Sequence, residues 1–166
     1  MKRIYLDVDG VLNPDSRSRP TDWDDYRKHQ VHLAFAGKHN IWLSRSMAET
    51  IASVAQKHRA EICWLTTWSG EANYWISPIF DWPELRVIRY DERTTDSGLI
   101  ISHGKIHGIK EDCGLDAVVW IDDGLGSDAR EWAEERTEPT LLVTPNSSRG
   151  LLKNHLDVID EFFEAW

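Results

Sequence analysis

The sequence predicts an α/β fold in which a mostly parallel sheet is covered by helices on both faces. Short apolar runs alternate along the chain with amphipathic runs of helical periodicity, which is typical of strands joined by crossover helices. The 166 residues favour one domain, 1–166, with a sizeable core. Hydrophobic residues make up 41% and charged residues 28% of the chain, a balance that argues against disorder.

Five short, largely apolar runs are predicted to form the sheet. They are Ile4–Val8, Glu61–Thr66, Leu85–Tyr90, Ala117–Ile121 and Thr140–Thr144. In an open sheet of this kind, ligands bind beyond the carboxyl ends of the strands. The residues that follow the apolar runs are therefore the first place to look for a functional site.

The clearest helix is predicted over residues 43–58, where Met47, Ile51 and other apolar residues recur at helical spacing. Ser46 and Glu49 have the spacing of a capping box. Four further helical runs alternate with the strands, the first limited by its proline and the second ended by a glycine. They are Glu71–Phe80, Ile106–Cys113, Ser127–Arg136 and Leu151–Trp166.

Residues 13–43 interrupt the alternation of strands and helices, and we interpret them as a flap inserted after the first strand. A β-hairpin is expected in it, with Gly37–Asn40 turning Val31–Phe35 back into Ile41–Leu43. The flap also carries a basic cluster that could attract a nucleotide or a polynucleotide end. Asp22, Asp24 and Asp25 interrupt the cluster, which favours a solvated, mobile loop over such a binding site. The cluster consists of Arg17, Arg19, Arg27 and Lys28.

Composition narrows the classes of function. The formal net charge of −9 argues against broad, nonspecific binding to nucleic acid, which needs a basic surface. No apolar run approaches the length of a transmembrane helix, and the first residues meet an acid too early for a secretory signal. Cys63 and Cys113 form no metal-ligand pair and fit a reducing compartment. We therefore expect a cytoplasmic protein without a membrane partner.

Acidic residues end the first predicted strand and the fourth. Asp7 and Asp9 follow the first strand, and Asp122 and Asp123 follow the fourth. Acids gathered in this way repel one another unless a cation or protonation compensates, and Mg²⁺ prefers hard oxygen ligands. Thr66 ends the second strand with a hydroxyl suited to phosphate oxygens.

A lysine near the third predicted helix would supply a fixed cation for the phosphate charge. Lys105 precedes this helix and is our choice, while Lys110 stays open as the alternative. Taken alone, each feature has an ordinary structural explanation: the acids could form an acidic turn, the threonine could cap a helix and the lysine could be solvated. The four features in this order are much harder to explain in that way.

These stretches resemble the haloacid dehalogenase (HAD) superfamily of phosphotransferases. The matching residues run in the family's order from Ile4-Tyr5-Leu6-Asp7-Val8-Asp9-Gly10 through Ile62–Thr66 and Lys105 to Val118–Asp123. The resemblance implies a Rossmann-like three-layer sandwich with strand order 3-2-1-4-5. It also implies Mg²⁺ and an aspartyl-phosphate intermediate.

The resemblance assigns a role to each matching residue. Asp7 corresponds to the nucleophile. Asp9 corresponds to the general acid/base, and its backbone carbonyl corresponds to a metal contact. Thr66 and Lys105 correspond to the groups that hold the phosphate. Asp122 corresponds to the acidic metal ligand, with Asp123 as an auxiliary ligand. The chain lacks room for the full cap domain of larger members, so that the flap is at most a minimal cap.

Three residues near Thr66 are candidate substrate contacts. They are Thr67, Trp68 and Asn73. Trp68 could stack on a base or sugar, although packing at the rim of the sheet is an equal reading. The resulting hypothesis is a magnesium-dependent phosphatase acting on a small phosphorylated metabolite or nucleotide. A nucleic-acid end-processing phosphatase and a noncatalytic binding module with this fold are the alternatives.

Overall fold

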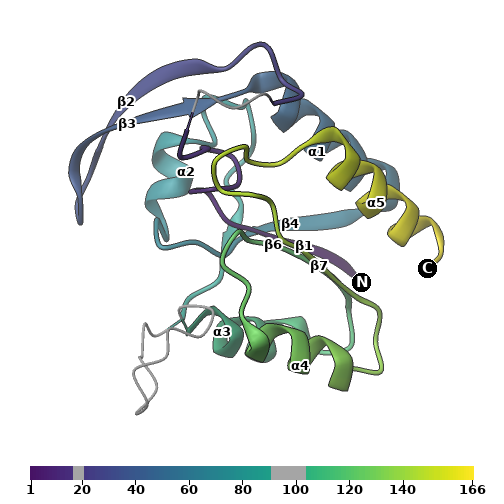
Figure 1. The fold of residues 1–166 in the computed structure, drawn as a ribbon. Coiled ribbons are helices and arrows are strands. Elements are labelled where there is room, and N and C mark those ends of the chain that lie inside the picture. The colour runs from purple at the N-terminus through teal and green to yellow at the C-terminus, as the bar shows by residue number, and fades with distance from the viewer. Residues whose placement is uncertain (17–20, 91–103) are drawn as a thin grey trace.

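The computed structural model describes residues 1–16, 21–90 and 104–166, which include a five-stranded parallel sheet between two layers of helices (Figure 1). The strands lie in the order β5-β4-β1-β6-β7. Their bounds are β1 Lys2–Leu6, β4 Ala60–Trp64, β5 Arg86–Val87, β6 Ala117–Ile121 and β7 Thr140–Val143. Counted among themselves along the chain, these strands run 3-2-1-4-5 across the sheet. The predicted α/β class with a mostly parallel sheet is confirmed.

Two layers of helices cover the sheet because each strand alternates its side chains between two cores. In β1, Ile4 and Leu6 enter one core and Tyr5 enters the other. The helices on the first face are α1 Arg45–His58, α2 Glu71–Trp75 and α5 Lys153–Glu164 (Figure 1). Those on the second face are α3 Lys105–Cys113 and α4 Ser127–Glu135. Within the described ranges, no helix is both long and apolar enough to cross a membrane.

The start of α1 differs from the sequence-based prediction. Ser44 is its N-cap, and the Ser44 hydroxyl accepts a hydrogen bond of 3.1 Å from the amide of Met47. The carboxylate of Asp25 accepts from the Ser44 hydroxyl and, at 2.9 Å, from the amide of Ser46. The predicted capping box at Ser46 was wrong, because Ser44 caps the helix and Ser46 lies in its first turn.

The predicted hairpin is present as β2 (Arg27–Leu33) and β3 (Gly37–Leu43), which pair in antiparallel fashion. Its turn occupies residues 34–36 rather than the predicted Gly37–Asn40, and Gly37 pairs with Leu33 at the start of β3. Gly37 has φ +66°, a conformation that glycine adopts without strain and that suits a three-residue hairpin loop. The predicted basic cluster is only partly described, since Arg17 and Arg19 lie outside the described residues.

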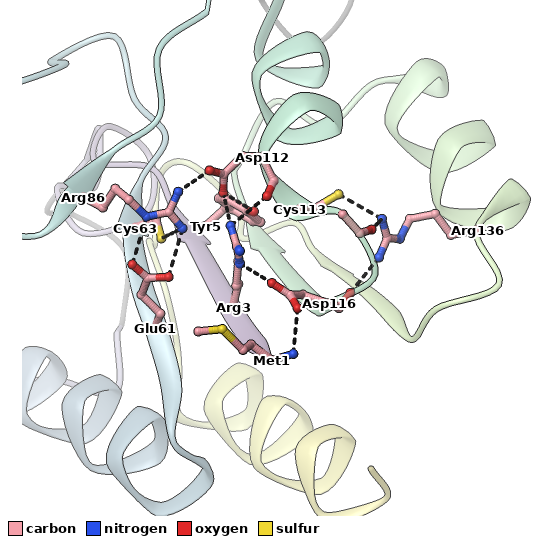
Figure 2. Close-up of polar contacts among 11 residues, drawn as sticks. Met1, Arg3, Tyr5, Glu61, Cys63, Arg86, Asp112, Cys113, Asp116 and Arg136 are labelled. Carbon is pink, nitrogen blue, oxygen red and sulfur yellow. Dashed lines mark hydrogen bonds and ion pairs between the residues drawn. The ribbon is translucent and has the colours of Figure 1, made fainter.

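A polar network holds the carboxyl-terminal end of α3 and the short strand β5 against β1 (Figure 2). Asp112 of α3 accepts hydrogen bonds from Arg3, from Tyr5 at 2.7 Å, and from Arg86. Arg86 also pairs with Glu61 of β4 at 2.9 Å. These contacts fix one end of α3 to the sheet and so position its other end, which begins at the carboxyl edge of the strands.

Candidate active site

The residues that follow β1 and β6 lie side by side at the carboxyl edge of the sheet. Leu6 is in register with Ile121, and the next amides continue the ladder. The amide of Asp7 donates to the Ile121 carbonyl at 3.1 Å, and that of Asp122 donates to the Val143 carbonyl at 3.1 Å. Two acids from segments far apart in the sequence are therefore held next to each other by backbone hydrogen bonds.

Lys105, the first residue of α3, lies between these two acids. Its Nζ is 2.6 Å from Oδ2 of Asp7 and 2.6 Å from Oδ2 of Asp122. All three residues are buried, and Lys105 is only 2% exposed. Lys110 is exposed in the last turn of the same helix. Of the two lysines considered from the sequence, Lys105 is thus the one that contacts the acids.

The site carries more negative than positive charge. Asp7, Asp122 and Asp123 each offer a carboxylate oxygen, and these oxygens lie within 4.8 Å of one another. Burial raises the pKa of Asp7 to about 7, although the Lys105 ammonium opposes the rise. Burial and the neighbouring Asp122 also raise the pKa of Asp123. For Lys105, burial lowers the pKa, but the carboxylates of Asp7 and Asp122 outweigh it and hold the lysine charged.

A tight turn brings Asp123 against the segment after β1. Gly10 has φ +70°, and a Cβ placed on it would lie 2.4 Å from Cγ of Asp123. Within the turn, the carbonyl of Val8 accepts hydrogen bonds from the amides of Leu12 and Asn13 at 2.9 and 3.0 Å. Only glycine allows the backbone to pass this close to the carboxylate.

Two buried side chains hold the carboxylate of Asp9. Oδ2 accepts from the indole Nε1 of Trp68 at 2.8 Å, and Oδ1 accepts from Nδ2 of Asn13 at 2.9 Å. Trp68 is 1% exposed, so that its ring is packed in the core instead of being open for stacking on a substrate. Sequence reasoning missed Asn13, whose only signal was its place four residues after Asp9 in the same turn.

Thr66 and Thr67 lie just beyond the end of β4. Thr66 is buried, its hydroxyl accepts from the amide of Trp68 at 3.3 Å, and its carbonyl accepts from the amide of Ser69 at 3.1 Å. Thr67 is exposed in the same turn. The two threonines therefore offer one buried and one accessible hydroxyl at the edge where the acids meet.

Asn73 lies apart from this group. Its Oδ1 accepts from Nε1 of Trp64 at 2.8 Å and from the amide of Leu85 at 2.9 Å. Its Nδ2 donates to the carbonyl of Leu85 at 2.7 Å. These bonds tie α2 to β4 and to the chain entering β5, so Asn73 has a role in the framework, and its contact with a substrate stays a prediction.

Comparison with known families agrees with this geometry. A family model described as "HAD domain in Swiss Army Knife RNA repair proteins" matches residues 3–156. The chain belongs to the HAD superfamily. The resemblance seen in the strand-end motifs is thereby confirmed. No curated protein and no solved structure gives a significant match.

The donor set of this HAD domain fits a magnesium ion. Three carboxylates converge, and one buried lysine in contact with two of them leaves negative charge uncompensated. Carboxylate oxygens are the ligands that Mg²⁺ takes, commonly together with substrate phosphate and water. The residues that could hold the ion are Asp7, Asp122 and Asp123.

Proposed function

We propose that this HAD domain is a magnesium-dependent phosphomonoesterase in which Asp7 is the nucleophile. The observation that carries the proposal is the contact of Lys105 with both Asp7 and Asp122, 2.6 Å each, inside a cluster of three carboxylates. A carboxylate can approach an anionic phosphate only where the charges of both are offset. Bound Mg²⁺ would supply that compensation together with the buried lysine.

The residues of the site divide the reaction into two displacements. A carboxylate oxygen of Asp7 forms a bond to phosphorus while the ester oxygen leaves and takes a proton from Asp9. Asp9 then accepts a proton from water, which attacks phosphorus, releases phosphate and restores Asp7. The hydroxyl of Thr66 and the ammonium of Lys105 are proposed to bind the phosphoryl oxygens. Acid–base assistance of this kind is worth roughly 10²–10⁴-fold.

The hydrogen bonds around Asp9 suit this role. Trp68 and Asn13 bind its two oxygens, so that the carboxyl group is held in one orientation above the turn. Positioned acids transfer protons far better than mobile ones, because the geometry of attack is already set. We infer that Trp68 and Asn13 are positioning residues for Asp9.

For the substrate, we propose the terminal phosphate of an RNA strand. The description of the matched family, which names RNA repair proteins, favours this alternative over a small phosphorylated metabolite. Residues 13–43, which include the hairpin, are proposed to act as a minimal cap. A cap of this size suits a bulky strand end better than a closed two-domain cleft does.

The test compares phosphate release from four substrates in the presence of Mg²⁺. They are an oligoribonucleotide with a 5′-phosphate, the same strand with a 3′-phosphate, a nucleoside monophosphate and p-nitrophenyl phosphate. We expect one of the RNA ends to give the highest kcat/KM. The Asp7→Asn variant should not turn over any substrate. The Asp9→Asn variant should turn over slowly while its substrate binding stays intact. A higher kcat/KM for the nucleoside monophosphate would instead support a phosphatase that acts on small phosphorylated molecules.

A further inference from the structure

The hairpin is unlike the rest of the chain in charge. Residues 26–43 contain no aspartate or glutamate, although the whole chain has 28 of these residues and a net charge of −9. The same segment contains three lysines or arginines and three histidines. They are Arg27, Lys28, His29, His32, Lys38 and His39. A local concentration of basic groups on an acidic protein favours a polyanionic ligand at this place.

The two faces of the hairpin have different environments. On the inner face, alternate residues are buried in the core, and these are Val31, Leu33, Ile41 and Leu43. The outer face carries the residues between them, with Lys28 opposite Trp42, Gln30 opposite Asn40, and His32 opposite Lys38. All six are exposed except Trp42, which is half-buried. Arg27 and Lys28, predicted as one basic cluster, therefore point to opposite faces.

The outer face is fixed relative to the candidate active site. At the base of the hairpin, the amide of Trp42 donates to Oδ1 of Asn13 at 2.9 Å, and Asn13 in turn binds Asp9. At the tip, the amide of Ala34 donates to Oε1 of Glu71 in α2 at 2.8 Å. Figure 1 shows the hairpin extending from the start of α1 past α2. The base of the hairpin is therefore linked to Asp9 through a single residue, Asn13.

We propose that the outer face of the hairpin binds the backbone of single-stranded RNA whose terminal phosphate enters the site at Asp7. This inference rests on the proposed function. The ammonium groups of Lys28 and Lys38 offset the charge of the phosphates. The side-chain amides of Gln30 and Asn40 hydrogen-bond to sugar or base. From Lys28 to His32 the face is roughly 13 Å long, enough for more than one nucleotide. Proteins that hold single strands commonly use such a basic track along the backbone.

The experiment measures binding separately from turnover. Fluorescence anisotropy follows a labelled, short single-stranded RNA without a terminal phosphate, in the absence of Mg²⁺. The test variant is Lys28→Glu with Lys38→Glu. The matched control is Lys110→Glu with Arg130→Glu, which reverses two exposed charges on α3 and α4, on the other face of the sheet. Both variants change the net charge of the protein equally.

We expect the hairpin variant to bind the RNA at least ~10-fold more weakly than the control, with a salt dependence reduced by about 1.4 in log–log slope for two lost phosphate contacts. Hydrolysis of p-nitrophenyl phosphate should be the same in both variants. Equal affinities, or no binding by the unmodified protein, would overturn the proposal. An equal loss of p-nitrophenyl phosphate and RNA hydrolysis would overturn it as well, by placing the hairpin in the chemical step.

The proposed function and the proposed RNA-binding surface can fail independently of each other. If the protein binds RNA through the hairpin but releases no phosphate from any substrate, the proposed function fails while the binding surface stands. If the Glu variant does not fold, as judged by its melting curve, Lys28→Gln with Lys38→Gln tests the same lysines without adding negative charge. Unchanged RNA affinity in that folded variant would also overturn the proposal.

Discussion

The two ends of α3 both hold carboxylates against basic groups, yet their charges balance differently. At the carboxyl-terminal end, three acids pair with three cations among the residues that the structure describes, so that their charges balance. The acids are Glu61, Asp112 and Asp116, and the cations are Arg3, Arg86 and the N-terminal ammonium of Met1 (Figure 2). At the other end, Lys105 contacts two of three clustered acids, and the cluster is left negative.

The pKa values of the acids follow this difference. Burial favours protonation at both ends of the helix. For Asp112, hydrogen bonds from Arg86, Tyr5 and Arg3 outweigh burial and lower its pKa. For Asp7, burial wins over Lys105 and the pKa rises to about 7. A neutral cluster needs no further ion, whereas a negative one is stabilised when a proton or a further cation binds, which is common at functional sites.

The largest expected effect separates the two clusters by activity. Asp7→Asn removes the nucleophile, and we expect phosphoryl transfer to fall at least ~10³-fold, since an amide cannot form the acyl phosphate. Without metal, the same change should leave the free energy of unfolding within about 1 kcal/mol of the unmodified protein, because one of several crowded charges is lost. Phosphate release and urea unfolding measure the two quantities. A large loss of stability with retained activity would show that the cluster around Asp7 stabilises the fold and is not the catalytic site.

Removal of metal should affect the cluster at the amino-terminal end of α3, where Lys105 contacts Asp7 and Asp122. With a chelator, we expect turnover to disappear and to return when Mg²⁺ is added. Binding to the folded state alone should also raise the free energy of unfolding, by about 2.7 kcal/mol when Mg²⁺ is at a hundred times its Kd. Thermal unfolding with and without Mg²⁺ measures the shift, and Asp122→Asn provides the control that should abolish it. Full turnover without any divalent ion would rule out the magnesium site.

At the other end, loss of one acid should cost stability. Asp112→Asn leaves Arg3 and Arg86 without their shared carboxylate in a partly buried place, and we expect the free energy of unfolding to fall by about 2 kcal/mol. Activity of the folded variant should fall much less than that of Asp7→Asn, because Asp112 acts only by holding α3. Urea unfolding and kcat/KM of the same preparation test this. An unchanged unfolding midpoint would show that the network contributes little.

The smallest effect is the dependence of that stability loss on pH. The pKa of Asp112 is lower in the folded chain than in the unfolded chain, so its contribution is present above the unfolded value and is lost as the pH falls through the folded value. The destabilisation by Asp112→Asn should therefore be full at neutral pH and shrink below about pH 4. Unfolding curves of both proteins across this range measure it. A constant difference down to the lowest pH would contradict the lowered pKa.

The sequence by itself determined the fold class and the neighbourhood of the acids. The parallel α/β sheet follows from the alternation of apolar and amphipathic runs, which is a local pattern. Because strands joined by crossovers are parallel, their ends meet at one edge, and Asp7 and Asp122 follow two such ends. Their proximity could thus be predicted without any knowledge of side-chain contacts.

Only the tertiary structure decided which side chains act on one another. The sequence favoured Lys105 but left Lys110 open, and the docking of α3 decided between them by bringing Lys105 against Asp7. For Trp68 the sequence left stacking on a substrate and packing at the rim of the sheet equally open. The structure buries it, and its indole donates to Asp9, 59 positions away in the chain. Periodicity reports which face of an element is buried, because it depends on neighbours along the chain. Hydrogen-bond partners at this separation depend on how whole elements pack, which no local pattern records.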